Sequence, residues 1–339
     1  MISLGYKLSS EEHGPVDLVR YAQMAQDAGF GFALISDHYH PWIDRQGQSP
    51  FVWSVIGAIA QATQRLVVGT AVTCPTMRIH PAIIAQAAAT SAALMPGRFF
   101  LGVGTGENLN EHVVGEGWPE TEVRQERLEE AIEVIRLLWK GGNQSHHGRY
   151  FTVENARLYT LPDSPPPLYV AVGGPKSADL AGRLGDGMIG TDPEASTVSA
   201  FDRAGGAGKP HYGELTVCWA KDESTARKIA KEHWPTSAME GNLSLELPLP
   251  EHFEAVGELV TEDQVAESIT WGPDPQRHLD AIRLYARAGY DHICVHQIGR
   301  DQKGFFEFYA EEILPALKTI NVTGRGRAKK PRRKGRSAR

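Results

Sequence analysis

The sequence has little cysteine and no long apolar run. Its three cysteines, Cys74, Cys218 and Cys294, are too few for a disulfide framework and too widely spaced for a CxxC metal pair. No stretch approaches the roughly 18 consecutive apolar residues of a membrane-spanning helix. The first residues lack a charged region followed by an apolar one, so we expect no signal peptide, no membrane partner and a cytoplasmic location.

Recognisable nucleotide and hydrolase motifs are also missing. There is no Walker A loop and no GxSxG nucleophile elbow. His38 and His40 form an HxH pair, which can bind zinc at the end of a barrel strand if later strands supply further ligands. The fifth and sixth predicted strands end without histidine, and His296 alone is not enough. We therefore predict no metal site.

Charge is unevenly distributed along the 339 residues. The formal net charge is −6, but residues 324–339 carry nine basic side chains and no acidic one. The rest of the chain holds 26 basic and 41 acidic side chains, a net charge of −15. We expect residues 324–339 to form a disordered, solvated tail, as blocks of like charge usually do. Nucleic acid could bind only to this tail, because the acidic body repels phosphate backbones.

Short apolar strands alternate with amphipathic helices, a pattern typical of βα units in a parallel sheet. This predicts an α/β protein, a (β/α)8 TIM barrel over residues 1–320, with an insertion at about residues 205–261 on the C-terminal face. A hairpin is predicted at residues 149–159. The eight predicted strands lie at residues 2–8, 32–36, 66–72, 98–104, 168–172, 188–190, 215–220 and 293–296.

A doubly wound sheet is the alternative fold. It is disfavoured because no GxGxxG turn follows the first predicted strand. The nearest glycine-rich run, GVGTGE at residues 102–107, follows the fourth strand and has the wrong final spacing.

Polar residues cluster where the predicted strands end. Glu11 follows the first strand, Asp37, His38 and Trp42 follow the second, and Glu107 follows the fourth. Each alone has a structural explanation as a turn cap or a packing residue. Because active sites of barrels lie at the C-terminal ends of the strands, their convergence on one rim favours an active site.

The fifth predicted strand ends in Gly173, Gly174 and Pro175 and leads into a helix. Glycine permits close approach to the backbone, and the free N–H groups of a helix start attract phosphate. This is the best candidate for an anion site, although the same three residues suit a plain strand-to-helix turn.

Four segments resemble one family. They read LGYK at residues 4–7, SDHYHPW at 36–42, GVGTGENLNE at 102–111 and VGGP at 172–175. The chain is similar in these segments to the F420-dependent glucose-6-phosphate dehydrogenase group of the luciferase-like oxidoreductase superfamily. The resemblance implies a (β/α)8 barrel, usually a homodimer, that binds the deazaflavin coenzyme F420 across the barrel mouth.

The resemblance also implies a set of cofactor contacts. It includes a non-proline cis peptide at Ala71–Val72 behind the ring, and Cys74 stands where the family often has threonine. The family pattern puts the following residues near the ring, ribityl chain and phosphate: Asp37, Thr105, Gly106, Asn110, Gly173, Gly174 and Pro175.

By the same resemblance, four residues carry the chemistry of hydride transfer from an alcohol. His38 is the expected base, since imidazoles titrate near neutral pH. Trp42 would pack over the reacting centre, and Glu107 would supply a proton to the reduced ring or stabilise its protonated form. Glu11 would hold or polarise His38.

The expected substrate is an unphosphorylated sugar or other alcohol. Family members that act on glucose 6-phosphate hold the phosphate with Lys and Arg from the late insertion, whereas residues 243–260 contain four glutamates and no Lys or Arg. Those carboxylates would repel a dianionic phosphate. Two alternatives stay open: an FMN-dependent monooxygenase of the same superfamily, and a cofactor-binding protein without catalytic activity.

Overall fold

Eight parallel strands close into a barrel in the computed structural model, which describes residues 2–239 and 241–319. Each strand pairs with the next one in the ring, and β11 returns to β1. The predicted (β/α)8 barrel is therefore confirmed, and the predicted tail at residues 324–339 lies outside the described residues. In ring order the strands are β1 (Ser3–Leu8), β2 (Phe32–Ile35), β3 (Val67–Thr70), β4 (Phe99–Val103), β7 (Leu168–Val172), β8 (Gly187–Gly190), β9 (His211–Cys218) and β11 (His292–Gln297).

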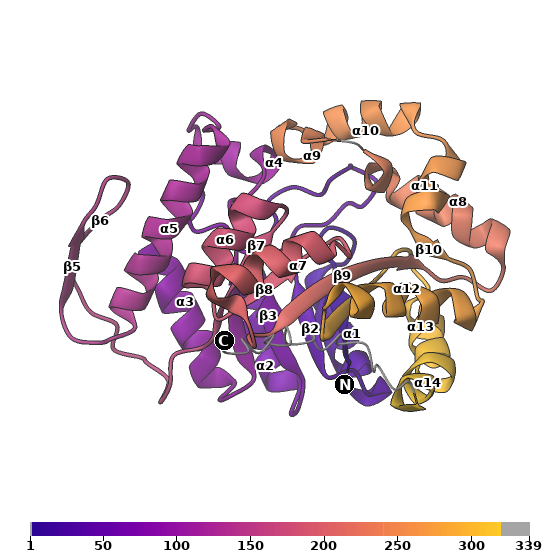
Figure 1. Ribbon diagram of the computed structural model, residues 1–339, viewed down its shortest axis with the longest axis horizontal. Helices are drawn as coiled ribbons and strands as arrows, with labels where there is room; N and C mark the ends of the chain where they lie inside the picture. Colours follow the sequence, from indigo (N-terminus) through magenta and orange to yellow (C-terminus); the bar gives the residue numbers. More distant parts are fainter. Residues whose placement is uncertain (1, 240, 320–339) are drawn as a thin grey trace, which may run out of the picture.

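Helices surround the barrel and carry their apolar side chains against it (Figure 1). In the described part of the chain, no helix is long and apolar enough to cross a membrane. The helices that follow barrel strands are α1 (Pro15–Ala28), α2 (Val52–Ala62), α3 (Pro81–Leu94), α4 (Asn108–Glu111), η1 (His112–Val114), α5 (Thr121–Leu138), α6 (Pro175–Leu184), α7 (Ala195–Phe201), η2 (Asp202–Gly206), α12 (Pro275–Ala288), α13 (Gln302–Phe308), η4 (Tyr309–Ile313) and α14 (Leu314–Thr319).

The segment between β9 and α12 covers one side of the barrel mouth, at the upper right of Figure 1. The predicted insertion, residues 205–261, thus spans a barrel strand as well as extra helices. The extra elements are α8 (Glu223–His233), η3 (Pro235–Ala238), α9 (Leu243–Glu246), α10 (Pro250–Leu259), α11 (Glu262–Ser268) and β10 (Thr270–Trp271), which pairs with β9.

The predicted hairpin is present but displaced. It consists of β5 (Gln144–His147) and β6 (Thr152–Ala156) rather than residues 149–159. The polar first strand has a weak sequence signal. Its position depends on Glu130 of α5, whose carboxylate accepts the backbone N–H groups of Tyr150 and Phe151 in the turn.

Aromatic rings fill the lower interior of the barrel, and glycines on neighbouring strands make room for them. Phe32, Phe100, Tyr169 and Tyr212 form one buried cluster there. A Cβ on Gly69 of β3 would lie 2.1 Å from the Phe100 ring, so only glycine fits beside that ring. The rings close the bottom of the barrel and leave open space only above them.

This packing predicts the effect of Gly69→Ala. Overpacking of a tight interior typically costs about 1–3 kcal/mol, so we expect the free energy of unfolding to fall by that amount in urea titrations. Gly117→Ala is the matched control, because Gly117 is exposed and a Cβ there would meet nothing within 4 Å. Equal stability of the two variants would contradict the interior packing described above.

Candidate active site

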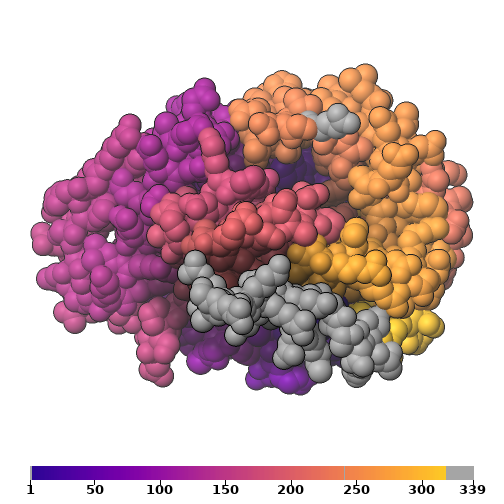
Figure 2. Space-filling view, in the orientation of Figure 1, coloured from indigo at the N-terminus to yellow at the C-terminus, as the bar shows by residue number. Residues whose placement is uncertain are grey.

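A cavity of about 1230 Å³ opens at the C-terminal ends of the barrel strands. Strand-end residues form its floor and part of its walls, and residues from α5, α6, η3, α9, α11 and α12 complete it. Figure 2 shows the surface hollowed between the orange segment that contains α9 and α10 and the salmon segment below it. Pockets of roughly 300–1,000 Å³ hold drug-sized ligands. This cavity is therefore large enough for an extended cofactor and a small substrate together.

A histidine and a glutamate lie side by side in the wall. Nε2 of His38, after β2, lies 3.3 Å from Oε1 of Glu11, after β1. Nδ1 of His38 lies 3.2 Å from the backbone oxygen of His40. The Trp42 ring packs edge-on against His38 with 5.1 Å between centroids, and it also contacts Phe253 of α10. The sequence-predicted catalytic residues on the first two strand ends therefore meet in one place.

Glu11 is held as a carboxylate. Burial by itself raises its pKa, but the charges of His38 and Lys7 and the hydrogen bond from Ser36 outweigh burial and lower the pKa to about 2. Ser36 donates to Glu11 Oε2 at 2.6 Å, and Ser9 donates to the same oxygen at 3.0 Å. Glu11 thus presents a fixed negative charge to the imidazole.

A buried ion pair forms the floor of the cavity. Lys7 Nζ lies 2.7 Å from Glu214 Oε2, and both side chains are largely buried. Burial lowers the pKa of Lys7, but the charges of Glu214 and Glu11 more than compensate, so the pKa is raised and the ammonium is retained. Nζ also donates to the carbonyl of Ala71 at 3.1 Å. The pair divides the aromatic lower interior from the polar cavity.

That carbonyl belongs to the Ala71–Val72 peptide, which is cis as the resemblance implied. Both residues line the cavity. Because Lys7 Nζ donates to the Ala71 oxygen, the ion pair at the cavity floor orients this peptide in the wall.

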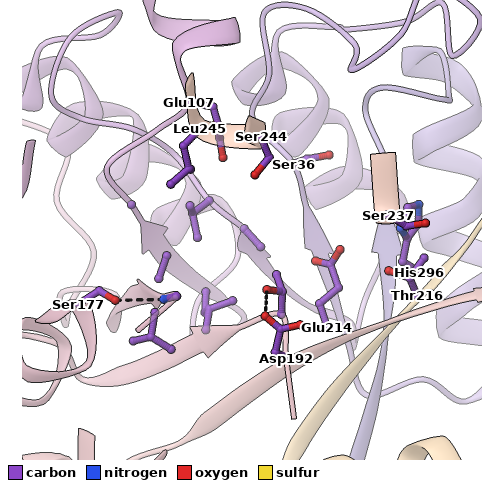
Figure 3. Close-up of a pocket in the computed structure, with 18 of the residues that line it drawn as sticks. Ser36, Glu107, Ser177, Asp192, Glu214, Thr216, Ser237, Ser244, Leu245 and His296 are labelled. Atoms are coloured by element: carbon purple, nitrogen blue, oxygen red, sulfur yellow. Dashed lines mark hydrogen bonds between the residues drawn. The ribbon is translucent and has the colours of Figure 1, made fainter. Parts of the chain in front are cut away.

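The opposite end of the cavity is a helix N-terminus. Gly173 and Gly174 precede α6, and a Cβ at either position would meet nothing within 4 Å. Ser177 Oγ accepts both glycine N–H groups, as the left of Figure 3 shows. Lys176 and Arg124 also line this end, and the Arg124 guanidinium stacks on Trp118. This end of the cavity therefore carries two cations, each paired with a glutamate outside the lining: Arg124 with Glu246 at 3.4 Å and Lys176 with Glu122 at 2.6 Å.

The predicted site residues divide into two sets. Eleven of the fourteen line the cavity, and three do not. Those that line it are Glu11, His38, Trp42, Ala71, Val72, Thr105, Gly106, Glu107, Gly173, Gly174 and Pro175.

The other three, Asp37, Cys74 and Asn110, are buried behind the wall. Asp37 accepts from Arg78 at 2.9 Å and from Thr73 at 2.7 Å. Asn110 Oδ1 accepts the N–H groups of Tyr39 and His40, which hold the loop after His38. Cys74 packs under Gly106, where a Cβ would lie 2.7 Å from its sulfur. Their positions suit support of the loops rather than contact with a ligand.

Sequence reasoning missed several charged residues of the site. Lys7 and Glu214 project from strand interiors, where a periodicity argument expects apolar side chains. A second missed pair is Arg78 and Glu111. The Glu111 carboxylate accepts the backbone N–H of Arg78 at 2.9 Å. Burial raises the pKa of Glu111 to about 7, although Arg78 opposes the shift. The signal that could have revealed Lys7 is a lone charge inside an otherwise apolar strand.

The two histidines of the HxH pair contact different partners. His38 faces Glu11, whereas Nδ1 of His40 lies 2.9 Å from the backbone oxygen of Leu109. Among residues 2–239 and 241–319, no group of three or more His, Cys, Asp or Glu side chains is arranged to hold a metal ion.

Comparison with known proteins agrees with this geometry. Residues 2–292 match the family model described as luciferase-like monooxygenase. An F420-dependent glucose-6-phosphate dehydrogenase from Beutenbergia cavernae is 37% identical over 330 residues, which cover 94% of this chain and 98% of that protein.

Solved structures show the same fold. A complex of an F420-dependent secondary alcohol dehydrogenase with an F420-acetone adduct superposes with a TM-score of 0.87 and 31% identity, covering 93% of this chain and 99% of that one. A monooxygenase from Streptomyces bottropensis superposes with a TM-score of 0.73 over 93% of this chain and 100% of that one, but at 20% identity it shares the fold alone. The chain belongs to the luciferase-like monooxygenase family, in the group that contains the F420-dependent glucose-6-phosphate dehydrogenases.

Proposed function

We propose that this protein is an F420-dependent dehydrogenase that oxidises the CH–OH group of an unphosphorylated sugar or other alcohol. The observation that carries the proposal is the His38–Glu11 pair beside Trp42, in the same cavity as the Ala71–Val72 wall and the Gly173–Gly174 end. The two F420-dependent dehydrogenases described above cover nearly the whole chain at 37% and 31% identity, whereas the monooxygenase is 20% identical.

The residues present fit F420. Gly173 and Gly174 leave open space beside the start of α6, where a phosphate would replace Ser177 Oγ as acceptor of the two glycine N–H groups and would lie near Lys176, which is exposed and paired with Glu122. The wall at Ala71 and Val72 is apolar and suits the face of a flat ring. When bound, F420 accepts a hydride from the carbon of the substrate alcohol.

The protein removes the hydroxyl proton in the same step. The hydrogen bond of His38 is made by Nδ1, which donates to the His40 carbonyl, whereas the 3.3 Å contact of Nε2 with Glu11 has only the distance of an ion pair. In the neutral imidazole Nε2 therefore carries the lone pair and accepts the substrate proton. The product is an imidazolium whose charge lies beside the Glu11 carboxylate. Glu11 therefore favours the proton-accepting direction, and Trp42 excludes water from one side of His38. The remaining wall carboxylate named by the family pattern, Glu107, is a second group able to exchange a proton.

The charge of the cavity favours a neutral substrate. Its lining contains three cations, of which Lys7 is paired with Glu214 and the other two, Arg124 and Lys176, lie at the Gly173–Gly174 end. Five carboxylates line it: Glu11, Glu107, Asp192, Glu214 and Glu267. A dianionic phosphate near His38 would meet these carboxylates without a free cation from the described lining.

The proposal predicts that FMN does not support turnover by this protein. It also predicts that His38→Asn abolishes F420 reduction. We expect loss of at least about 100-fold in kcat, the usual contribution of a general base, with the affinity for F420 unchanged. The measurement is bleaching of the oxidised F420 absorption with sugars, sugar phosphates and simple alcohols. His40→Asn is the matched control, on the same loop and outside the cavity. Tight FMN binding without F420 reduction by any alcohol would refute the proposal.

The charge state of Glu11 predicts a dependence of stability on pH. Its pKa is depressed from 4.5 to about 2 in the folded protein, so its stabilising contribution is complete above pH 4.5 and is lost as the pH falls towards 2. The shift corresponds to about 3 kcal/mol. We expect Glu11→Gln to lower the free energy of unfolding at pH 7 by this order, and the difference from wild type to shrink in acid.

Denaturant titrations between pH 7 and pH 2 make this measurement. Glu258→Gln is the control, because Glu258 is exposed on α10 and forms no ion pair with another described residue. A Glu11→Gln difference that is the same at every pH would show that its carboxylate is not the source of the stability.

We further propose that the protein is a homodimer that uses the outer faces of α2 and α3. Neither helix contains a charged residue, although the body of the chain is strongly acidic. Exposed apolar side chains lie on or beside them: Phe51, Ile83 and Leu94 are each more than 40% exposed. An uncharged apolar surface of this kind is typical of an interface between subunits.

This interface is tested by Ile83→Glu. A carboxylate buried between two copies would be desolvated without a partner, so we expect dissociation to a monomer in size-exclusion chromatography with light scattering. Leu259→Glu, at an 81% exposed leucine of α10, serves as the control and should leave the mass unchanged. A dimer that survives Ile83→Glu places the interface elsewhere.

A further inference from the structure

Two consecutive glutamates, Glu11 and Glu12, lie in the turn that follows β1 and face opposite sides. Glu11 faces His38 after β2, and Glu12 faces His296 at the end of β11, with Glu12 Oε2 2.9 Å from His296 Nε2. Because β1 lies between β11 and β2 in the barrel, the two carboxylate–histidine pairs flank the same strand. The proposed reaction uses only the first pair.

The second pair belongs to the same cavity. His296 lines it, and its side chain is 1% exposed. Its strand partner Thr216 lines the cavity as well, and Figure 3 shows both together with Ser237 at the end away from Ser177. The Trp234 ring covers His296 edge-on at 4.5 Å. These residues form one end of the cavity, which we call the His296 end.

One atom of this end lacks a partner. Since a carboxylate only accepts, Glu12 assigns the proton to Nε2 of His296 and leaves a lone pair on Nδ1. Nδ1 is buried and has no hydrogen-bond partner within residues 2–239 and 241–319. An enclosed polar atom without a partner is unfavourable, so a ligand hydroxyl that donates to it would be favoured.

The neighbours indicate what kind of ligand group fits. Thr216 and Ser237 offer hydroxyls, and the nearby carboxylates of Glu12 and Glu267 would repel an anion. Among the described lining residues on β1, β2, β9 and β11, Lys7 is the one Lys or Arg, and it is paired with Glu214. Strands two apart lie roughly 10 Å apart, and two side chains that extend into the cavity narrow that gap. A gap of this order suits a molecule the size of a sugar.

We infer that the His296 end binds a second hydroxyl of the substrate, so that the substrate class is a neutral polyhydroxylated compound, a sugar or polyol, rather than a monohydric alcohol. This inference rests on the proposed dehydrogenase function. His38 accepts the proton of the reacting hydroxyl, and His296 positions the molecule through a hydroxyl that does not react. His296 is therefore a specificity residue.

Steady-state kinetics of F420 reduction with D-glucose, xylitol and propan-2-ol test the inference. For His296→Phe, which keeps a ring but removes both nitrogens, we expect KM for the polyhydroxylated substrates to rise about tenfold or more, the effect of one lost hydrogen bond. Values of kcat/KM for propan-2-ol should stay within about threefold of wild type. Thr216→Val should raise KM for the same substrates by a smaller factor.

Two further variants separate recognition from structure. His296→Asn restores a polar atom near the position of Nδ1 and should recover part of the lost affinity. His13→Gln removes a neighbouring buried histidine that does not line the cavity and should leave both substrate classes unchanged. Thermal unfolding followed by circular dichroism verifies that each variant is folded. Equal losses on propan-2-ol and on the polyols, or turnover of propan-2-ol alone by the wild type, would overturn the inference.

A binding measurement keeps this result distinct from a failure of the proposed function. If no alcohol reduces F420, the dehydrogenase proposal is wrong. Isothermal titration of xylitol and D-glucose into the cofactor-free protein still reports on the His296 end. Heat of binding that is present in wild type and lost in His296→Phe supports the subsite, and its absence from wild type refutes it.

Discussion

The ion pair between Lys7 and Glu214 is the interaction on which the rest of the site depends. It closes the top of the aromatic interior, holds the Ala71 carbonyl and places a positive charge near Glu11. Loss of either partner would leave a buried charge without compensation, which typically costs 3–5 kcal/mol. The cavity wall, the charge of Glu11 and hence the surroundings of His38 all follow from this one contact.

A second network supports the loops at the strand ends. Arg78 connects Asp37 after β2 with Glu111 in the α4 segment, and Asn110 holds the backbone of the loop that follows His38. These side chains are buried and bind one another or the nearby backbone, and Arg78 Nε, which lacks a hydrogen-bond partner among the described residues, lies 3.7 Å from Glu111. The catalytic candidates can therefore project into the cavity from a rigid support, which is what a preorganised site requires.

Two features of the barrel show how far the fold was predictable. The apolar runs of β2, β3 and β4 are buried on both faces, and this gives them a continuous signal that places each of them correctly. β9 begins at His211, four residues before the predicted start, because its first half, HYGE, contains charged and small residues and gives no apolar run. The hairpin is displaced because Glu130 of the preceding helix α5, about 20 residues before the turn, accepts the N–H groups of the turn.

The sequence by itself determined the α/β barrel, the rim that carries chemistry and the meeting of His38, Trp42 and Glu11. These follow from periodicity and strand order, which local side-chain patterns encode. Only the tertiary structure decided that Asp37, Cys74 and Asn110 lie behind the wall, because the direction of a loop side chain depends on its partners. It alone also paired Lys7 with Glu214, 207 residues away, and Glu12 with His296, 284 residues away. Such pairs form when the barrel closes and brings β1 beside β11 and within side-chain reach of β9, and no local pattern records those contacts.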